Sequence, residues 1–156
     1  MSTTVQDRIA IIRDFLPRLR GLLAGLSDEQ LTTAYLPGEW TIAQNVHHLL
    51  DAHVNSYLLF KRVLTEEQPQ LAWPDQDAVA DLPDGCSPRI ESSLMALEGL
   101  HIRWTETLEA IQDWSKAGTS LDSGKTYTLD DLLSIYSRHC NNHIQQIMDV
   151  LDAHNQ

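Results

Sequence analysis

Four stretches of the chain carry apolar residues at spacings of three and four, and this helical period constrains the fold most strongly. In the first stretch Ile9, Ile12, Leu16 and Leu19 fall on one side of a helix. No run shows the alternation that is typical of a half-buried strand. Four amphipathic helices can bury their apolar faces against one another. The sequence therefore predicts an all-α protein, a four-helix bundle, in which residues 1–156 form a single domain.

The predicted helices are separated by segments that contain proline or glycine. We expect them at residues 3–26, 41–65, 89–115 and from 129 onward. Pro17 interrupts the first helix, but the apolar stripe keeps its phase across it, so we expect one bent helix with a kink or short break.

Short polar side chains mark where several helices begin. Thr41 and Thr128 are expected to be N-caps, and the segment SDEQL predicts a short helical turn over residues 28–33. The connection at 66–88 is proline-rich and unusually long, and loops of this length are often functional or lie over another element.

The charge of the chain restricts its partners. With 22 acidic and 11 basic residues, the net charge is −11, which disfavours nucleic acid and anionic membrane surfaces. No apolar run is long enough to span a membrane, and the N-terminal MSTTVQDRIAIIRDF lacks the pattern of a signal peptide. We therefore expect a cytoplasmic protein, with Cys86 and Cys140 as free thiols.

Two histidines occupy the apolar stripe of the last helix. His139 and His143 lie on the face that continues through Ile147 and Val150. Residues four apart are neighbours on a helix surface, so both imidazoles can reach one metal ion. A buried polar group without a partner costs roughly 1–3 kcal/mol, which a bound ion would avoid. The spacing indicates a metal site, although two histidines hydrogen-bonded to neighbouring groups would give the same pattern.

A third ligand has to come from another helix, and HHLLDAH in the second helix offers three histidines. His53 has the most inward position on a helical wheel. His48 lies on the flank of the apolar stripe, which suits a site open to solvent, and His47 faces away and is expected to be exposed. Spacing alone leaves the choice between His53 and His48 open.

The segments PGEWTIAQNVHHLLDAHVNSYLLFKRVLTE, LHIRW and YSRHCNNHIQQI, in this order, resemble the DinB-like superfamily. Within it they are similar to the YfiT-type "putative metal-dependent hydrolases", a branch that includes bacillithiol transferases. The resemblance covers almost the whole chain. It implies an antiparallel-type four-helix bundle with three histidine ligands to a divalent metal ion, which correspond here to His48, His139 and His143. It also implies a homodimer.

The chain departs from these relatives in its last motif. Members of the branch carry more histidines there, whereas Cys140, Asn141 and Asn142 stand between the two histidines of this chain. Histidine is kept at the three ligand positions, and the residues that differ lie next to the ligands.

Three neutral imidazoles leave a fourth coordination position for water or substrate. Zn²⁺ or Ni²⁺ held in this way would activate a metal-bound water or a metal-bound thiolate, so the catalytic group is one of these rather than a named side chain. The histidine pattern and the resemblance together favour a metal-dependent thiol (S-)transferase or hydrolase acting on a small molecule. The resemblance to the transferases implies a low-molecular-weight thiol as co-substrate in the first case. The alternatives are a non-catalytic metal-binding stress or sensor protein, and a metal-free bundle that dimerises through an apolar face.

Several other residues have weaker roles in this interpretation. We expect His101 to be a hydrogen-bonded interface histidine and Cys140 to be a small buried residue. Gln44 or Asp51 could orient His48, or be solvated surface groups. We expect Trp40 to close the start of the second helix, and Trp73 to pack in the interior or to wall the pocket.

Overall fold

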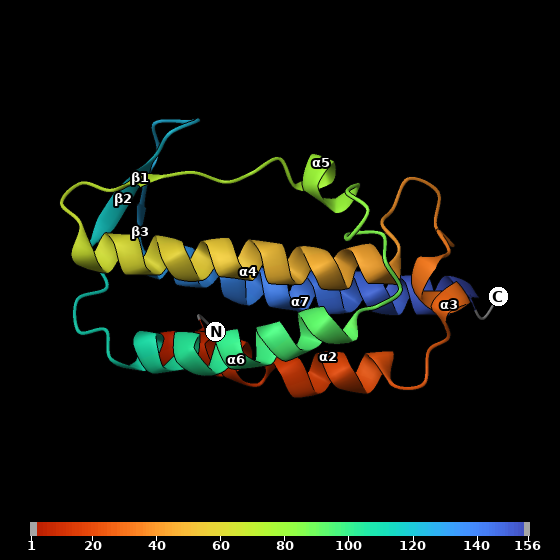
Figure 1. The fold of residues 1–156 in the computed structure, drawn as a ribbon. Coiled ribbons are helices and arrows are strands. Elements are labelled where there is room, and N and C mark those ends of the chain that lie inside the picture. Colours follow the sequence, from red (N-terminus) through yellow and green to blue (C-terminus); the bar gives the residue numbers. More distant parts are fainter. Residues whose placement is uncertain (1–2, 155–156) are drawn as a thin grey trace.

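The computed structural model describes residues 3–154, and its long helices lie side by side as the predicted four-helix bundle (Figure 1). The first rod of the bundle consists of α1 (Val5–Arg13) and α2 (Phe15–Leu23). The other three rods are α4 (Ile42–Thr65), α6 (Glu91–Glu109) and α7 (Leu129–His154). Within residues 3–154, no helix is both long enough and apolar enough to cross a membrane.

The break in the first rod falls at Asp14, three residues before Pro17. Proline has no N–H, and its ring crowds the carbonyl four residues earlier, so the helix is interrupted there. Pro17 then lies in the first turn of α2, where an N–H has no helical acceptor in any case. As a result, carbonyls in the last turn of α1 lack donors from their own helix and are available to other groups.

The predicted N-caps are confirmed. The Thr41 hydroxyl accepts from the backbone N–H of Gln44 at 3.1 Å, and the Gln44 side chain accepts from the Thr41 N–H. Thr128 and Asp131 form the same reciprocal pair at the start of α7. The predicted turn is also present, as α3 (Asp28–Thr32). These pairs fix where α4 and α7 begin, and with that the rotation of the histidines they carry.

The helices are not all antiparallel to their neighbours, in contrast to the antiparallel-type bundle that the resemblance implied. Contacts between α4 and α6 advance together along both helices, from His47 with Ser93 to His53 with His101. Those two helices are therefore parallel, whereas α4 and α7 are antiparallel. The cause is the long connection after α4, which returns along the bundle before α6 begins (Figure 1).

This connection contains structure that the sequence did not predict. It forms β1 (Gln70–Leu71) and the short helix α5 (Gln76–Ala80). Strand β1 pairs in parallel with β2 (Ala117–Ser120), and β2 pairs antiparallel with β3 (Thr126–Thr128). Strands of two to four residues are too short to show an alternating pattern.

Helix α6 ends at Glu109, earlier than the predicted residue 115. Carbonyl groups of the segment that follows accept hydrogen bonds from the first backbone N–H groups of α7, so this segment is not part of α6. The backbone N–H of Leu129 donates to the carbonyl of Lys116 at 2.8 Å, and that of Asp130 donates to the carbonyl of Trp114. Gly118 is also required here, since a Cβ would lie 2.8 Å from the Pro69 carbonyl oxygen.

The core lies between the four rods and extends along their whole length. Trp104 and Phe60 are fully buried and pack against each other, and the buried Phe15 packs against His53 and His101. Trp73 is half-buried, donates from Nε1 to the Tyr136 hydroxyl at 2.7 Å, and packs against Tyr127. Trp73 therefore has the packing role that the sequence allowed.

Candidate metal centre

The structure brings together the side chains of His48, His139 and His143, here called the three-histidine cluster. His48 lies in the second turn of α4, and the other two lie one turn apart on α7. Each ring offers a nitrogen, and these atoms all lie within 4.8 Å of one another. The Nε2 atoms of His48 and His139 are 3.2 Å apart, and those of His139 and His143 are 3.1 Å apart.

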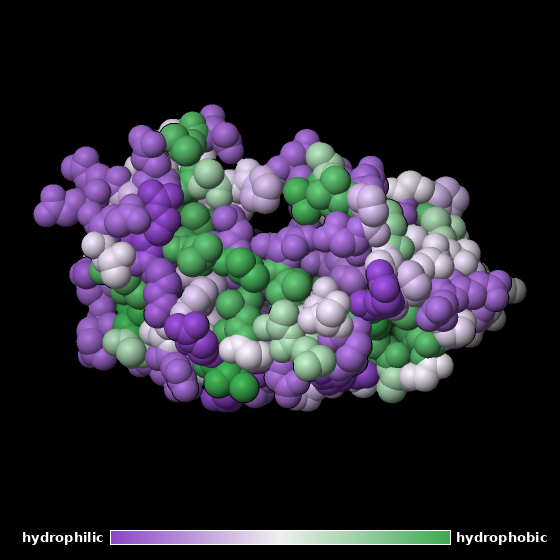
Figure 2. Space-filling model, in the orientation of Figure 1, coloured by the Kyte–Doolittle hydropathy of each residue, from purple (hydrophilic) through white to green (hydrophobic). Residues whose placement is uncertain are grey.

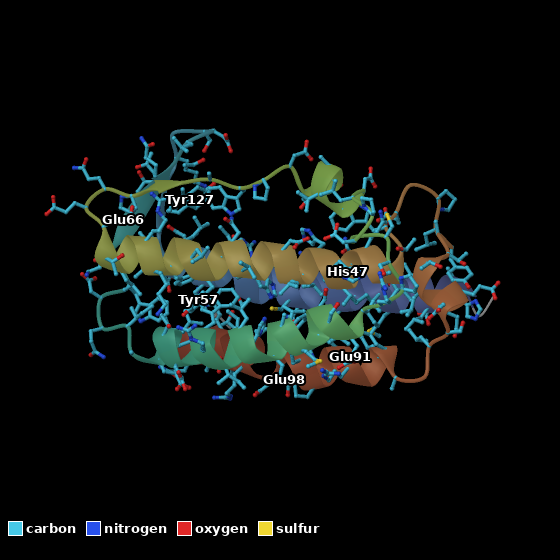
Figure 3. The ribbon with its side chains drawn as sticks, in the orientation of Figure 1. His47, Tyr57, Glu66, Glu91, Glu98 and Tyr127 are labelled. Carbon is cyan, nitrogen blue, oxygen red and sulfur yellow. The ribbon has the colours of Figure 1, made fainter. Side chains whose placement is uncertain are left out.

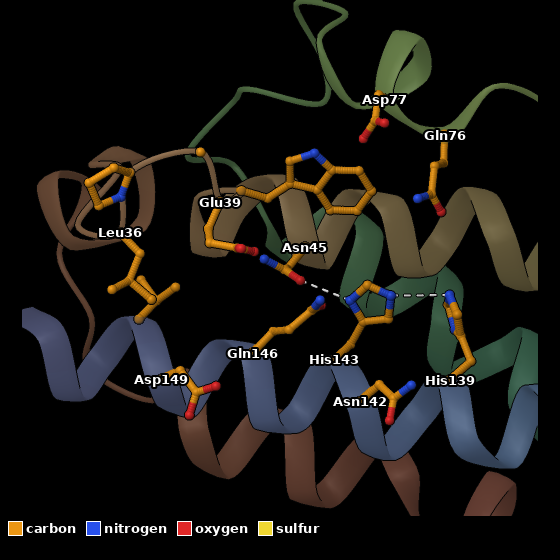
Figure 4. A pocket seen from close by; sticks show the side chains of 14 residues that line it. Leu36, Glu39, Asn45, Gln76, Asp77, His139, Asn142, His143, Gln146 and Asp149 are labelled. Carbon is orange, nitrogen blue, oxygen red and sulfur yellow. Dashed lines mark hydrogen bonds between the residues drawn. The ribbon is translucent and has the colours of Figure 1, made fainter.

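Asn45 sets the orientation of one ring in the cluster. Its Nδ2 donates to the Thr41 carbonyl at 3.0 Å, which places its Oδ1 as the acceptor for Nδ1–H of His143 at 2.8 Å. A neutral imidazole carries one proton, so Nε2 of His143 holds a lone pair. That lone pair points toward His139 (Figure 4).

Burial keeps the cluster uncharged. Loss of hydration lowers the pKa of His48 and of His139 to about 4. The pKa of His143 falls further, to about 2, because the neighbouring rings of His139 and His48 add to the effect of burial. All three rings are therefore neutral near pH 7, which is the state in which imidazole binds a metal.

The three histidines of α4 have different positions. His48, rather than His53, joins the cluster, although spacing alone left the choice open. His53 lies behind the cluster, with Nε2 3.1 Å from Nδ1 of His139. The expectation that His47 is exposed is wrong. Its side chain is buried between Ser93 and the Ser87 carbonyl, because α6 runs along that side of α4 (Figure 3).

A cavity of about 740 Å³ opens on one side of the cluster (Figure 4). His139 and His143 form part of its wall. Trp40 lies across its edge, with its ring 4.7 Å from that of His48 and stacked at 9° on that of His143. Trp40 therefore closes the start of α4, as expected, and also shapes the cavity.

The outer wall of the cavity is polar. It includes the carboxylates of Glu39, Asp77 and Asp149. Helix α5 of the long connection supplies Asp77 and Gln76, so this connection walls the site rather than merely joining two helices. Among the described residues that line the cavity there is no lysine or arginine.

The remaining candidates lie away from the three rings. Gln44 caps α4 and donates to the Ala80 carbonyl and to Asp81. Asp51 is exposed and makes no hydrogen bond to His48. Cys140 is fully buried, as expected, and burial raises the pKa of its thiol, which makes it a poor nucleophile. Both cysteines are free.

The sequence interpretation missed the contact that Asn45 makes with the cluster. Asn45 lies three residues before His48, on the same face of α4, and is 2% exposed. The sequence did contain one indication of this contact, namely a carboxamide side chain one helical turn from a candidate ligand. Glu39 and Asp77 gave no such indication, because a loop and the short helix α5 of the long connection bring them to the site.

Comparison with known proteins places the chain in a family. The sequence pattern of the DinB superfamily matches residues 12–147. A "putative metal-dependent hydrolase" of Geobacillus thermodenitrificans is 40% identical over 148 residues, which are 94% of this chain and 83% of the relative. The "putative metal-dependent hydrolase YfiT" of Bacillus subtilis is 35% identical over 144 residues, which are 91% and 81% of the two chains.

Solved structures agree with this assignment. The structure of YfiT from Bacillus subtilis, described as a probable metal-dependent hydrolase with an unusual four-helix bundle topology, superposes with a TM-score of 0.90 at 33% identity, covering 96% of this chain and 87% of YfiT. A mycothiol-dependent maleylpyruvate isomerase shares the fold, with a TM-score of 0.71 at 17% identity, over 94% of this chain and 63% of the isomerase. The chain is therefore a YfiT-like member of the DinB superfamily.

Proposed function

We propose that the protein is a metal-dependent enzyme in which His48, His139 and His143 bind one divalent ion, Zn²⁺ or Ni²⁺. The reaction is thiol transfer or hydrolysis on a small molecule. The observation that carries the proposal is the convergence of three neutral imidazole nitrogens from two helices beside an open cavity. Three ligands with an accessible fourth position are typical of catalytic rather than structural zinc sites.

The donor set fits such an ion. Zinc binds imidazole nitrogen at about 2.0–2.1 Å, so two nitrogens of a tetrahedral site lie about 3.3 Å apart. The Nε2 separations of 3.1 and 3.2 Å in the cluster are close to this value. The rings are also neutral, so none has to lose a proton before binding.

When bound, an ion with three imidazole ligands supplies Lewis acidity that activates either water for hydrolysis or a thiol for transfer. The chain itself contributes position. Asn45 holds His143 in the tautomer that presents Nε2, and Trp40 covers one side of His48 and His143. The cavity then brings the second reactant to the exposed side of the rings.

The lining of the cavity indicates the kind of substrate. Carboxylates of Glu39, Asp77 and Asp149 repel phosphorylated and other polyanionic molecules, and the described lining has no positive side chain to offset them. Neutral molecules and those with an amino group are the better match.

The names of the related proteins support hydrolysis in one case and thiol chemistry in the other. The relatives at 35–40% identity are named as hydrolases. The isomerase with the same fold is mycothiol-dependent, so this scaffold also supports chemistry that uses a low-molecular-weight thiol. We propose such a thiol as a co-substrate.

Two assays on the zinc- and nickel-loaded protein separate the reactions. One follows conjugation of small thiols to a generic electrophile, and the other follows hydrolysis of ester and amide substrates. The true activity should fall by at least about 1,000-fold in His143→Ala, since the whole catalytic group is lost. Activity that is equal in the variant would contradict the proposal.

A metal-binding stress or sensor protein without turnover is the alternative. It shares the three ligands but does not need a cavity of about 740 Å³ beside them. The cavity favours the enzyme. Metal binding without either activity would favour the sensor.

We also propose a homodimer. Val54 and Leu58 on α4 and Met95 and Ile102 on the adjacent α6 are exposed. Figure 2 shows apolar side chains gathered on one face of the molecule. Light scattering should show a dimer that Leu58→Glu converts to a monomer, and a monomeric wild type would exclude it. The cytoplasmic location stays a prediction from the sequence.

A further inference from the structure

From His139 of the cluster inward, three imidazoles and one backbone carbonyl are joined in series. Nδ1 of His139 is 3.1 Å from Nε2 of His53, and Nδ1 of His53 is 2.8 Å from Nε2 of His101. Nδ1 of His101 is 2.7 Å from the carbonyl oxygen of Ile12. We call this series the imidazole chain. It crosses the core from α7 through α4 and α6 to the end of α1.

The carbonyl at the far end gives the imidazole chain a direction. A carbonyl only accepts, so His101 must donate from Nδ1 to Ile12. A neutral imidazole has one proton, so Nε2 of His101 accepts, and His53 donates to it from Nδ1. By the same step His139 donates from Nδ1 to His53, and Nε2 of His139 is left with a lone pair that faces the cluster.

The two rings behind His139 are neutral and shielded from water. His53 is fully buried, and His101 is 3% exposed. Burial lowers the pKa of His101 to about 4 and that of His53 well below its ordinary value. Phe15 stacks on His101, and Trp104 meets both buried rings edge-on. His53 and His101 therefore bond to neighbouring rings and to the Ile12 carbonyl rather than to solvent.

The origin of the direction lies in the break of the first rod. Ile12 is in the last turn of α1, where carbonyls lack a helical donor. The interruption before Pro17 thus provides the acceptor on which the orientation of every later ring depends.

We propose that His53 and His101 are positioning residues of the metal site, which together with the Ile12 carbonyl hold His139 in the tautomer that presents Nε2 as a ligand. This rests on the metal site proposed above. With His143 oriented by Asn45, two lone pairs then face each other across 3.1 Å without a proton between them. A cation bound by both nitrogens relieves this repulsion. Asn45 and the imidazole chain therefore orient both lone pairs for metal binding before the ion binds.

The tautomers can be measured directly in metal-free protein. Long-range ¹H–¹⁵N spectra of histidine-labelled wild type near pH 7.5 should show His139, His53 and His101 all protonated at Nδ1 and not at Nε2. His139 protonated at Nε2 would overturn the proposal. This measurement needs neither a variant nor bound metal.

Variants test the effect on the ion. His101→Leu removes the acceptor for His53, so His53 and His139 are free to reverse their tautomers. Affinity for Zn²⁺ and Co²⁺, measured by chelator competition, should fall about 10–100-fold, and the visible Co²⁺ spectrum should change. His101→Gln keeps an acceptor at that place, and its affinity should stay within about threefold of wild type.

His47→Leu is the matched control, because His47 is also a buried histidine of the α4–α6 interface with both ring nitrogens bonded, but it is not in the imidazole chain. Its metal affinity should equal that of wild type. Wild-type affinity in His101→Leu, or an equal loss in His47→Leu, would contradict the proposal. A wild type that binds neither ion would instead contradict the metal site itself, while the tautomer of His139 would still show whether the imidazole chain sets it.

Discussion

The two sides of the three-histidine cluster differ in what surrounds them. On the inner side, the rings meet the imidazole chain and a tightly packed aromatic core that contains Trp104. On the outer side, they meet a cavity with Trp40 at its edge and carboxylates in its wall. The inner side leaves no room for solvent, and the outer side is open to it. This difference shows how one helix pair can hold imidazoles against a packed core on one side and expose them to a cavity on the other.

The largest expected difference between the two sides concerns stability. Trp104→Ala removes a fully buried ring and should lower the free energy of unfolding by about 3–5 kcal/mol. Trp40→Ala removes a half-buried ring at the edge of the cavity and should cost only about 1 kcal/mol, while reducing activity. Urea unfolding of the two variants measures this. Equal costs would show that the outer side is as tightly packed as the inner side.

Acid should lower the free energy of unfolding of the metal-free protein, because the neutral histidines buried on the inner side of the cluster bind protons more readily when the chain is unfolded. The pKa of His101 is lowered to about 4 when folded, compared with about 6.5 when unfolded, so the unfolded state binds more protons between these values. Stability is therefore complete above about pH 6.5 and falls as the pH drops toward 4, by about 3 kcal/mol for His101 alone. Unfolding curves at several pH values test this. His101→Gln should show a shallower decline, and a wild-type stability that is constant from pH 6.5 to 5 would be inconsistent with buried neutral histidines.

A smaller effect is expected at the boundary between the two sides, where Asn45 orients His143. Asn45→Ala leaves Nδ1–H of His143 without its acceptor, and metal affinity should fall about 10–100-fold. Asn142→Ala is the control, since Asn142 lines the cavity but bonds to no ring of the cluster. Chelator competition compares the two. An equal loss in both variants would mean that the polarity of the cavity, rather than the orientation of His143, determines affinity.

Much of the bundle could be predicted from the sequence because helical features are local. The period of apolar residues, the N-caps at Thr41 and Thr128, and the interruption at Pro17 are each determined by residues within a few positions of one another. The direction of α6 and the small sheet were missed because they depend on the long connection after α4. Its strand β1 pairs with residues almost 50 positions away, as Gln70 does with Thr119.

The grouping of the three histidines was predictable to a similar degree. The spacing of His139 and His143 follows from one helix, and the resemblance to relatives selected His48 as their partner. Periodicity detected that His53 faces inward but could not show that it lies behind His139 rather than beside it. The burial of His47 and the role of Asn45 require knowledge of which helices are neighbours, and a single sequence does not contain that information explicitly.

The proposed function depends on the binding of one metal ion by His48, His139 and His143. Elemental analysis of protein purified without added metal, for wild type and His143→Ala in parallel, tests it most directly. We expect about one divalent ion per wild-type chain and a nearly metal-free variant with unchanged helix content. Equal metal in the two proteins, or none in either after incubation with Zn²⁺ or Ni²⁺, would contradict the account.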